Sequence, residues 1–340
     1  IREVVRIAPR AALMVAPWPL NKKAKIDYGR LLRQECPSNL TLVPTFRNPR
    51  EDWLDGYATV LETLAEGIDL RGARPRRGTV AIVGYLMDRG EGEHRGNVKE
   101  LGRICRALGL RLVSVWLSGG SIAELRAVRD AGVIISLPHG RRAAAVLARR
   151  LKADLIEAEI PLGLGRTEAW IRLVAAGAGR QRLAESYIAK ELGRIIPRLE
   201  WVVPYALLNR KIAFSGDPYM ASGMASLCSE IGAALIAAFL TGASSKARNP
   251  ANIGAVAQPS ASQARAIWKR LERDGVDLLI GNTDAFALLQ PKCPYIEFGY
   301  PSLRHHVLRE EPYLGFEGAL GLIQRMSNAF VPFAARRASP

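Results

Sequence analysis

Short apolar runs and longer helical patterns alternate along most of this chain. Between residues 79 and 176, runs of strand length occur at 80–84, 111–117, 133–137 and 155–160. A second series lies between 211 and 300, at 211–215, 234–240, 253–256, 276–280 and 295–298. Such runs, bounded by glycine or proline and separated by helical patterns, are typical of parallel strands with crossover connections. The pattern therefore predicts two parallel sheets.

The predicted fold class is α/β, with consecutive Rossmann-like domains that each contain a parallel sheet and crossover helices. We expect these domains to face each other across a cleft. We expect residues 79–176 to form a middle domain. Residues 184–335 are expected to form a C-terminal domain, closed by a helix that starts at Phe316. Residues 1–70 carry strand-like runs and an amphipathic helix, and we interpret them as the C-terminal remnant of an earlier α/β domain.

The composition narrows the partners expected for this chain. Its 340 residues are 49% hydrophobic, and no apolar run is long enough to cross a membrane, so we expect no membrane partner. A net charge of +16 favours nucleic acid, but the basic residues are scattered and no aromatic-interleaved basic motif occurs. We therefore expect no nucleic-acid partner, while a basic surface suited to an acidic protein stays open.

The four cysteines, at 36, 105, 228 and 293, form no C-x-x-C pair. This spacing argues against a zinc site or a thioredoxin motif within the chain, and it indicates a reducing, cytoplasmic compartment. No signal peptide is recognisable, and a sequence that starts at Ile1 without methionine is expected to be a fragment.

Glycine-rich turns follow several of the predicted strands, at the strand ends where open parallel sheets bind ligands. Ser118-Gly119-Gly120-Ser121 follows the second strand of the middle domain, and its backbone N–H groups would suit an anionic ligand. An N-cap at Ser121 explains the same turn equally well.

Three further strand-end turns are assigned to the same binding site, through Gly140, Gly163 and Asn282. His139, beside Gly140, would donate a hydrogen bond or transfer protons there, although capping of the next helix is an equal alternative. Neither G-x-G-x-x-G nor G-x-x-x-x-G-K-[ST] occurs, so we expect no NAD and no ATP on this chain.

A pair of histidines, His305-His306, lies in the loop after the last predicted strand. We expect this loop to reach the cleft, with at most one ring facing it because adjacent residues of an extended loop point in opposite directions. A neutral imidazole there would bind a metal or donate a proton. The alternative is an exposed pair without a role.

Several stretches of the chain are similar to the component 1 subunits of the nitrogenase family. This family includes dinitrogen-reducing proteins, cofactor-assembly scaffolds, and dark-operative protochlorophyllide and chlorophyllide reductases. The matching stretches occur in the family's order at 52–62, 83–85, 117–121, 160–163 with Thr167, 277–282, 298–301 and 312–319.

The resemblance implies a subunit of three Rossmann-like domains that pairs with a homologous component 1 subunit in a dimer or heterotetramer. Its electrons would come from a separate P-loop homodimer that carries a [4Fe-4S] cluster, which explains the missing P-loop here. An iron–sulfur cluster or a related metal cofactor is implied as well. In the dinitrogen-reducing members, the histidine that ligates the cofactor stands where this sequence has His305.

The sequence departs from the family pattern at two places. The loop after the third strand of the middle domain reads Leu137-Pro138-His139, where the dinitrogen-reducing members carry a cysteine ligand. The cysteine-bearing first domain is largely missing, and Cys36 does not match its cluster ligands. Cluster ligands are therefore not identifiable in this chain.

The preferred hypothesis is an oxidoreductase subunit of a nitrogenase-like two-component system. Backbone groups of 118–121 would hold a substrate or metal cofactor in the cleft, and His139 with His305 or His306 would supply protons or a ligand. Two alternatives stay open: a non-catalytic cofactor-assembly scaffold of the same family, or a nucleotide-sugar glycosyltransferase, which also pairs two Rossmann-like domains.

Overall fold

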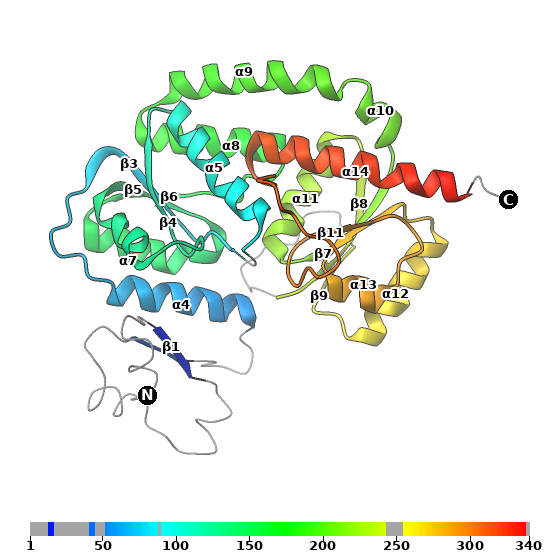
Figure 1. Ribbon diagram of the computed structural model, residues 1–340, viewed down its shortest axis with the longest axis horizontal. Helices are drawn as coiled ribbons and strands as arrows, with labels where there is room; N and C mark the ends of the chain where they lie inside the picture. The colour runs from blue at the N-terminus through cyan, green and yellow to red at the C-terminus, as the bar shows by residue number, and fades with distance from the viewer. Residues whose placement is uncertain (1–12, 17–40, 45–51, 88–89, 243–253, 338–340) are drawn as a thin grey trace.

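The computed structural model describes residues 13–16, 41–44, 52–87, 90–242 and 254–337, and two parallel sheets dominate it (Figure 1). The middle sheet has the order β4-β3-β5-β6, and every neighbouring pair in it is parallel. Its strands are β3 (Arg76–Val83), β4 (Arg111–Val115), β5 (Ala131–Ser136) and β6 (Asp154–Glu157).

The C-terminal sheet has the order β11-β10-β7-β8-β9 and is parallel throughout. Its strands are β7 (Lys211–Gly216), β8 (Ala234–Leu240), β9 (Gly254–Ala257), β10 (Leu278–Gly281) and β11 (Tyr295–Glu297). The predicted α/β class with parallel sheets and crossover helices is thus confirmed. A separate small sheet pairs β1 (Leu13–Ala16) with β2 (Thr41–Pro44).

Helices connect the strands and cover both sheets (Figure 1). Those of the middle unit are α4 (Trp53–Gly67), α5 (Gly92–Ala107), α6 (Ile122–Arg126), α7 (Arg141–Leu151) and α8 (Leu164–Ala178), with 3₁₀ turns η1 (Ala127–Asp130) and η2 (Pro138–Gly140). The remainder are α9 (Gln181–Leu199), α10 (Val202–Ala206), α11 (Pro218–Glu230), α12 (Ala261–Arg273), α13 (Thr283–Leu289) and α14 (Gly315–Arg337). No helix of the described segments is long and apolar enough to cross a membrane.

One hydrophobic core runs through both sheets. It contains Ile82 and Ile135 from the middle sheet, Phe214 and Ile280 from the C-terminal sheet, and Phe316 from α14. Because α14 packs against both α5 and α8, the closing helix joins the two units. Their relative placement is therefore stabilised by shared apolar burial.

Helix α4 packs on the outer face of the middle sheet, against α7. Its buried residues Leu61 and Leu64 belong to a second core with Trp116 and Leu147. The amphipathic helix that we assigned to residues 1–70 therefore completes the middle unit. Of the remnant expected at residues 1–70, residues 1–12, 17–40 and 45–51 lie outside the described residues, and so does Cys36.

Candidate functional site

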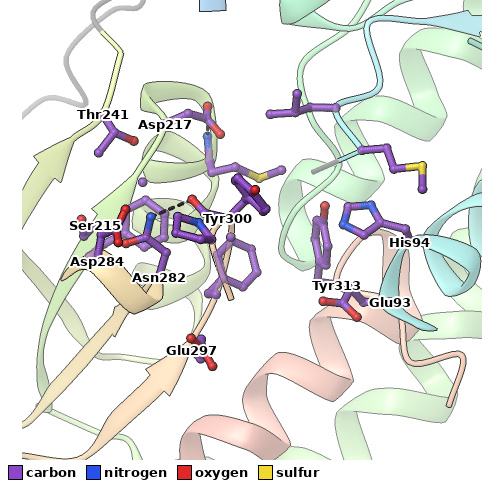
Figure 2. Close-up of a pocket in the computed structure, with 18 of the residues that line it drawn as sticks. Glu93, His94, Ser215, Asp217, Thr241, Asn282, Asp284, Glu297, Tyr300 and Tyr313 are labelled. Carbon is purple, nitrogen blue, oxygen red and sulfur yellow. Dashed lines mark hydrogen bonds between the residues drawn. The ribbon is translucent and has the colours of Figure 1, made fainter. Parts of the chain in front are cut away.

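A cavity of about 600 Å³ lies where the carboxyl ends of the two sheets meet (Figure 2). It is lined by residues that follow β3, β7, β8, β10 and β11, together with the first residues of α4 and α5 and part of α14. A strand-end position for a ligand site is what parallel sheets predict. The volume falls within the range of small-molecule pockets.

One wall of the cavity is polar and comes from the C-terminal unit. Figure 2 shows Ser215, Asp217, Thr241, Asn282 and Asp284 together on this side. Asp217 is the N-cap of α11, and its Oδ1 accepts backbone N–H bonds from two residues of the first turn at 2.9 and 3.1 Å. The Asn282 side chain bonds in two directions, because Oδ1 caps α13 and Nδ2 donates to the Tyr300 carbonyl at 2.7 Å. Helix capping thus fixes polar side chains at the cavity surface.

The opposite wall is formed by the middle unit and by Tyr313. His94 and Tyr313 lie side by side there (Figure 2), with ring centroids 5.8 Å apart. The His94 Nδ1 lies 2.8 Å from the Tyr85 hydroxyl, to which Asn97 also donates at 3.1 Å. The side-chain Oδ1 of Asn97 accepts from the Tyr313 backbone N–H at 2.9 Å. This buried network fixes the orientation of the His94 imidazole at the cavity surface.

Glu297, at the end of β11, forms the floor of the cavity. Its carboxylate accepts backbone N–H bonds from Leu303 at 3.2 Å and Arg304 at 3.0 Å, and a short bond from the Thr283 hydroxyl. The Arg325 guanidinium, which also lines the cavity, donates to the Glu297 carbonyl at 2.8 Å. Glu297 therefore shapes both the cavity and the loop that follows β11.

His139 lies at the junction of the two units, behind the polar wall. Its side chain is only 1% exposed, and its Nε2 is 3.5 Å from the Asp217 Oδ1. The ring packs edge-on against Tyr219 and Tyr57, at centroid distances of 5.0 and 6.3 Å. Neither ring nitrogen forms a hydrogen bond with the part of the chain that is described. His139 thus contacts the cavity wall through Asp217 but does not line the cavity itself.

His305 and His306 do not lie in this cavity. Both side chains are exposed, and neither is among the residues that line it. The loop is held at one end by Glu297 and at the other by Glu91, which accepts from the Val307 N–H at 2.7 Å and lies 2.8 Å from the His306 Nδ1. These anchors direct the pair to the surface, which corrects the position that we expected. A catalytic or metal-binding role for either ring stays a prediction.

The predicted glycine-rich turns also lie outside the cavity. Ser121 caps α6, with its Oγ accepting from the Glu124 N–H at 3.4 Å, as the alternative interpretation expects. A ligand-binding role for residues 118–121 stays a prediction. A Cβ at Gly140 would lie 2.5 Å from the Gly84 backbone, so this glycine permits close packing of two turns. At Gly163, the N-terminus of α8 is occupied by the Glu230 carboxylate, which accepts from the N–H of the next residue at 2.7 Å.

Of the predicted ligand-binding residues, only Asn282 lines the cavity. Sequence reasoning did not assign Glu93, His94, Asp217 or Tyr313 to the site. Their positions in the sequence could have indicated the site. Glu93 and His94 lie in the first turn of the first helix after β3, and Asp217 directly follows β7. Polar residues at those strand ends belong to the ligand-binding edge of a parallel sheet.

The cavity residues do not fit an iron–sulfur cluster. Such clusters are held by cysteine thiolates, and no cysteine lines the cavity. Cys105 and Cys228 are buried in the core, and burial raises the pKa of each thiol to about 12, which disfavours the thiolate. In the described ranges, no three His, Cys, Asp or Glu side chains are grouped so that they could hold a metal ion.

The comparisons with known proteins identify the family. The model of the nitrogenase component 1 type oxidoreductases matches residues 27–331, so this chain belongs to that family and the predicted resemblance is confirmed. It is 22% identical to the nitrogenase molybdenum-iron protein beta chain of Methanococcus maripaludis, over 91% of this chain and 72% of the relative. It is 25% identical to the nitrogenase vanadium-iron protein beta chain of Trichormus variabilis, over 56% of this chain and 43% of the relative.

A solved structure supports the fold. The chain resembles that of "Nitrogenase Cp1 at pH 6.5" with a TM-score of 0.80 and 16% identity, over 99% of this chain and 79% of the other. At this level of identity the likeness concerns the arrangement of sheets and helices. It agrees with the two parallel sheets described above.

Proposed function

We propose that this chain is a subunit of a nitrogenase-like two-component reductase and that its cavity holds an organic substrate during reduction. The observation that carries the proposal is the cavity itself. It measures about 600 Å³, lies at the strand ends, combines aromatic and apolar side chains with one polar wall, and has no cysteine among its described lining residues. Family membership supports this class of reaction, since the matching family model describes component 1 type oxidoreductases.

The electrons would enter from outside the described residues. A P-loop homodimer with a [4Fe-4S] cluster would donate them, coupled to its own ATP hydrolysis, and a homologous component 1 subunit would complete the assembly. This chain contributes the substrate site in that scheme. Among its described residues, no three His, Cys, Asp or Glu side chains are grouped so that they could hold a metal ion, so the proposal places no cluster in this cavity.

The side chains around the cavity provide the proton chemistry that reduction requires. Adding two electrons to a double bond leaves two positions that must each take a proton, and groups at the cavity surface would supply them. His94 lines the cavity with its ring held by Tyr85. Asp217 lines it as well, with His139 directly behind it. We assign His94 as one proton donor and the Asp217–His139 pair as the route of the other.

The glycosyltransferase alternative is replaced by the family assignment. The cavity chemistry agrees, because Asp217, Asp284 and Glu297 would repel a diphosphate. A cofactor-assembly scaffold would have to hold a metal cluster, for which this cavity offers no thiolate. The reductase proposal therefore accounts for more of the site.

The proposal is tested by purifying the full chain anaerobically with its cognate component 1 subunit and reductase. We expect the dithionite-reduced reductase to be oxidised in the presence of MgATP and a small-molecule extract of the source cells. Omission of this chain or of MgATP should abolish the oxidation. Oxidation at an equal rate without this chain would overturn the proposal.

A further inference from the structure

The cavity carries a charge opposite to that of the whole chain. Glu93, Asp217, Asp284 and Glu297 line it, against the single guanidinium of Arg325 among the described lining residues. The chain as a whole has a net charge of +16. An acidic cavity in a basic protein concentrates negative potential in one place and selects for ligands of positive charge.

Three of these carboxylates lack a lysine or arginine partner among the described residues, although the Nε2 of His139 lies 3.5 Å from the Asp217 Oδ1. In the described parts of the chain, Asp217, Asp284 and Glu297 form no ion pair with lysine or arginine. Carboxylates elsewhere behave differently, since Glu100 and Glu191 both pair with Arg103 at 2.7 and 3.0 Å. Asp217 and Glu297 are instead held in place by backbone N–H donors. These contacts hold both carboxylates in place at the cavity surface.

Aromatic rings surround the same space. Trp53, Tyr57, Phe298, Tyr300 and Tyr313 all line the cavity, and Tyr300 is 65% exposed, so its ring reaches solvent. Aromatic faces attract cations through the ring quadrupole, and they stack well on flat organic groups. The carboxylates and the aromatic rings of the cavity therefore both favour a cationic organic ligand.

We propose that the cavity recognises an organic cation, a protonated amine or a quaternary ammonium group attached to an apolar or aromatic body. The inference rests on the proposed function, because it assigns a ligand class to the site at which reduction is proposed. The charged end would face Asp217, Asp284 and Glu297, while the apolar body would lie against Phe298 and Tyr313.

Three probes of similar shape but different charge test this proposal by calorimetry on the full chain. They are benzyltrimethylammonium, the neutral 2,2-dimethyl-3-phenylpropan-1-ol and the anionic 2,2-dimethyl-3-phenylpropanoate. We expect the cation to bind roughly 5- to 30-fold more tightly than the neutral probe, and the anion to bind more weakly than both. The preference for the cation should shrink at high salt. Equal or weaker binding of the cation would overturn the inference.

Variants that remove a single negative charge test whether the cation binds in the cavity. Asp284→Asn and Asp217→Asn keep the shape of the side chain, and an asparagine at 217 still caps α11. Each should weaken cation binding by roughly 3- to 10-fold without changing the affinity of the neutral probe. Asp154→Asn, at an exposed position on β6 away from the cavity, is the matched control and should have no effect. An equal loss in the control would contradict binding in the cavity.

The binding assay needs neither reductase nor MgATP, so the two proposals fail separately. Cation binding without reductase oxidation would overturn the proposed function and support the ligand class. Reductase oxidation without a preference for the cation would overturn the ligand class alone.

Discussion

Individual glycines at the strand ends of the middle unit allow two turns to meet backbone to backbone. A Cβ on Gly140 would lie 2.5 Å from both the N and Cα atoms of Gly84. No real Cβ tolerates that distance, so one of the turns would have to move. Gly140 therefore serves the packing behind His139, although the sequence indicated a ligand-binding role.

Gly140→Ala should lower the free energy of unfolding by about 1–3 kcal/mol, since it overpacks a rigid contact between two backbones. Urea denaturation followed by circular dichroism measures this change. Gly193→Ala in α9 is the matched control, because nothing lies within 4 Å of its added Cβ. The control should stabilise the protein by about 0.5–1 kcal/mol. A neutral Gly140→Ala would contradict the close packing.

The described cysteines should be unreactive in the folded protein. Burial raises the pKa of Cys105, Cys228 and Cys293 to about 12. Because the thiolate is the reactive form, alkylation at about pH 8 should be roughly a thousandfold slower than for a free thiol. Mass spectrometry of a Cys36→Ser variant after iodoacetamide treatment checks this. Fast alkylation of Cys105 or Cys228 without denaturant would show that its thiol is not buried as described.

At the scale of elements, one helix start is capped by a residue of another unit. Glu230 at the end of α11 accepts from the backbone N–H groups of Leu164 and Gly165 at 2.7 and 3.1 Å. Carboxylates at helix N-termini stabilise through both hydrogen bonds and the helix dipole. The contact therefore fixes α8 against α11 across the junction of the two units.

Glu230→Ala should cost about 1–2 kcal/mol of stability, because two backbone donors of α8 lose their acceptor. Glu230→Gln should recover part of this loss, since the amide keeps one acceptor oxygen. Glu200→Ala, at an exposed position after α9, serves as the control and should change stability little. Thermal unfolding compares the three variants, and equal melting temperatures for all of them would contradict the capping role.

Elements of this fold are far more predictable from sequence than the side chains of its site. The runs at 211–215 and 234–240 became β7 and β8 because buried parallel strands need continuous apolar residues. The position of His305 was wrong because the path of its loop depends on Glu91, which is 215 residues away from its partner His306. Local sequence patterns carry no information about such a contact. For the same reason, the sequence did not predict the role of His94, whose orientation depends on Tyr85 and Asn97.

At the scale of the whole molecule, the two sheets and α14 enclose a single site. The core that runs from Ile82 to Phe214 and Phe316 holds the strand ends together. A preformed cavity of this kind needs little rearrangement to bind a ligand. The acidic and aromatic cavity is therefore a preformed feature of this chain.

The central claim is that reduction takes place in this cavity. It is tested most directly by a variant whose larger side chain fills the cavity. Thr241 lines the cavity and is itself exposed, so Thr241→Trp should occupy the space without disturbing the core. Ser229→Trp, at an exposed position on α11 outside the cavity, is the control. The measurement is MgATP-dependent oxidation of the reductase with the cell extract. We predict that Thr241→Trp reduces it at least tenfold (about 1.4 kcal/mol in the barrier) and that Ser229→Trp preserves it. Undiminished oxidation with a correctly folded Thr241→Trp variant would contradict the account.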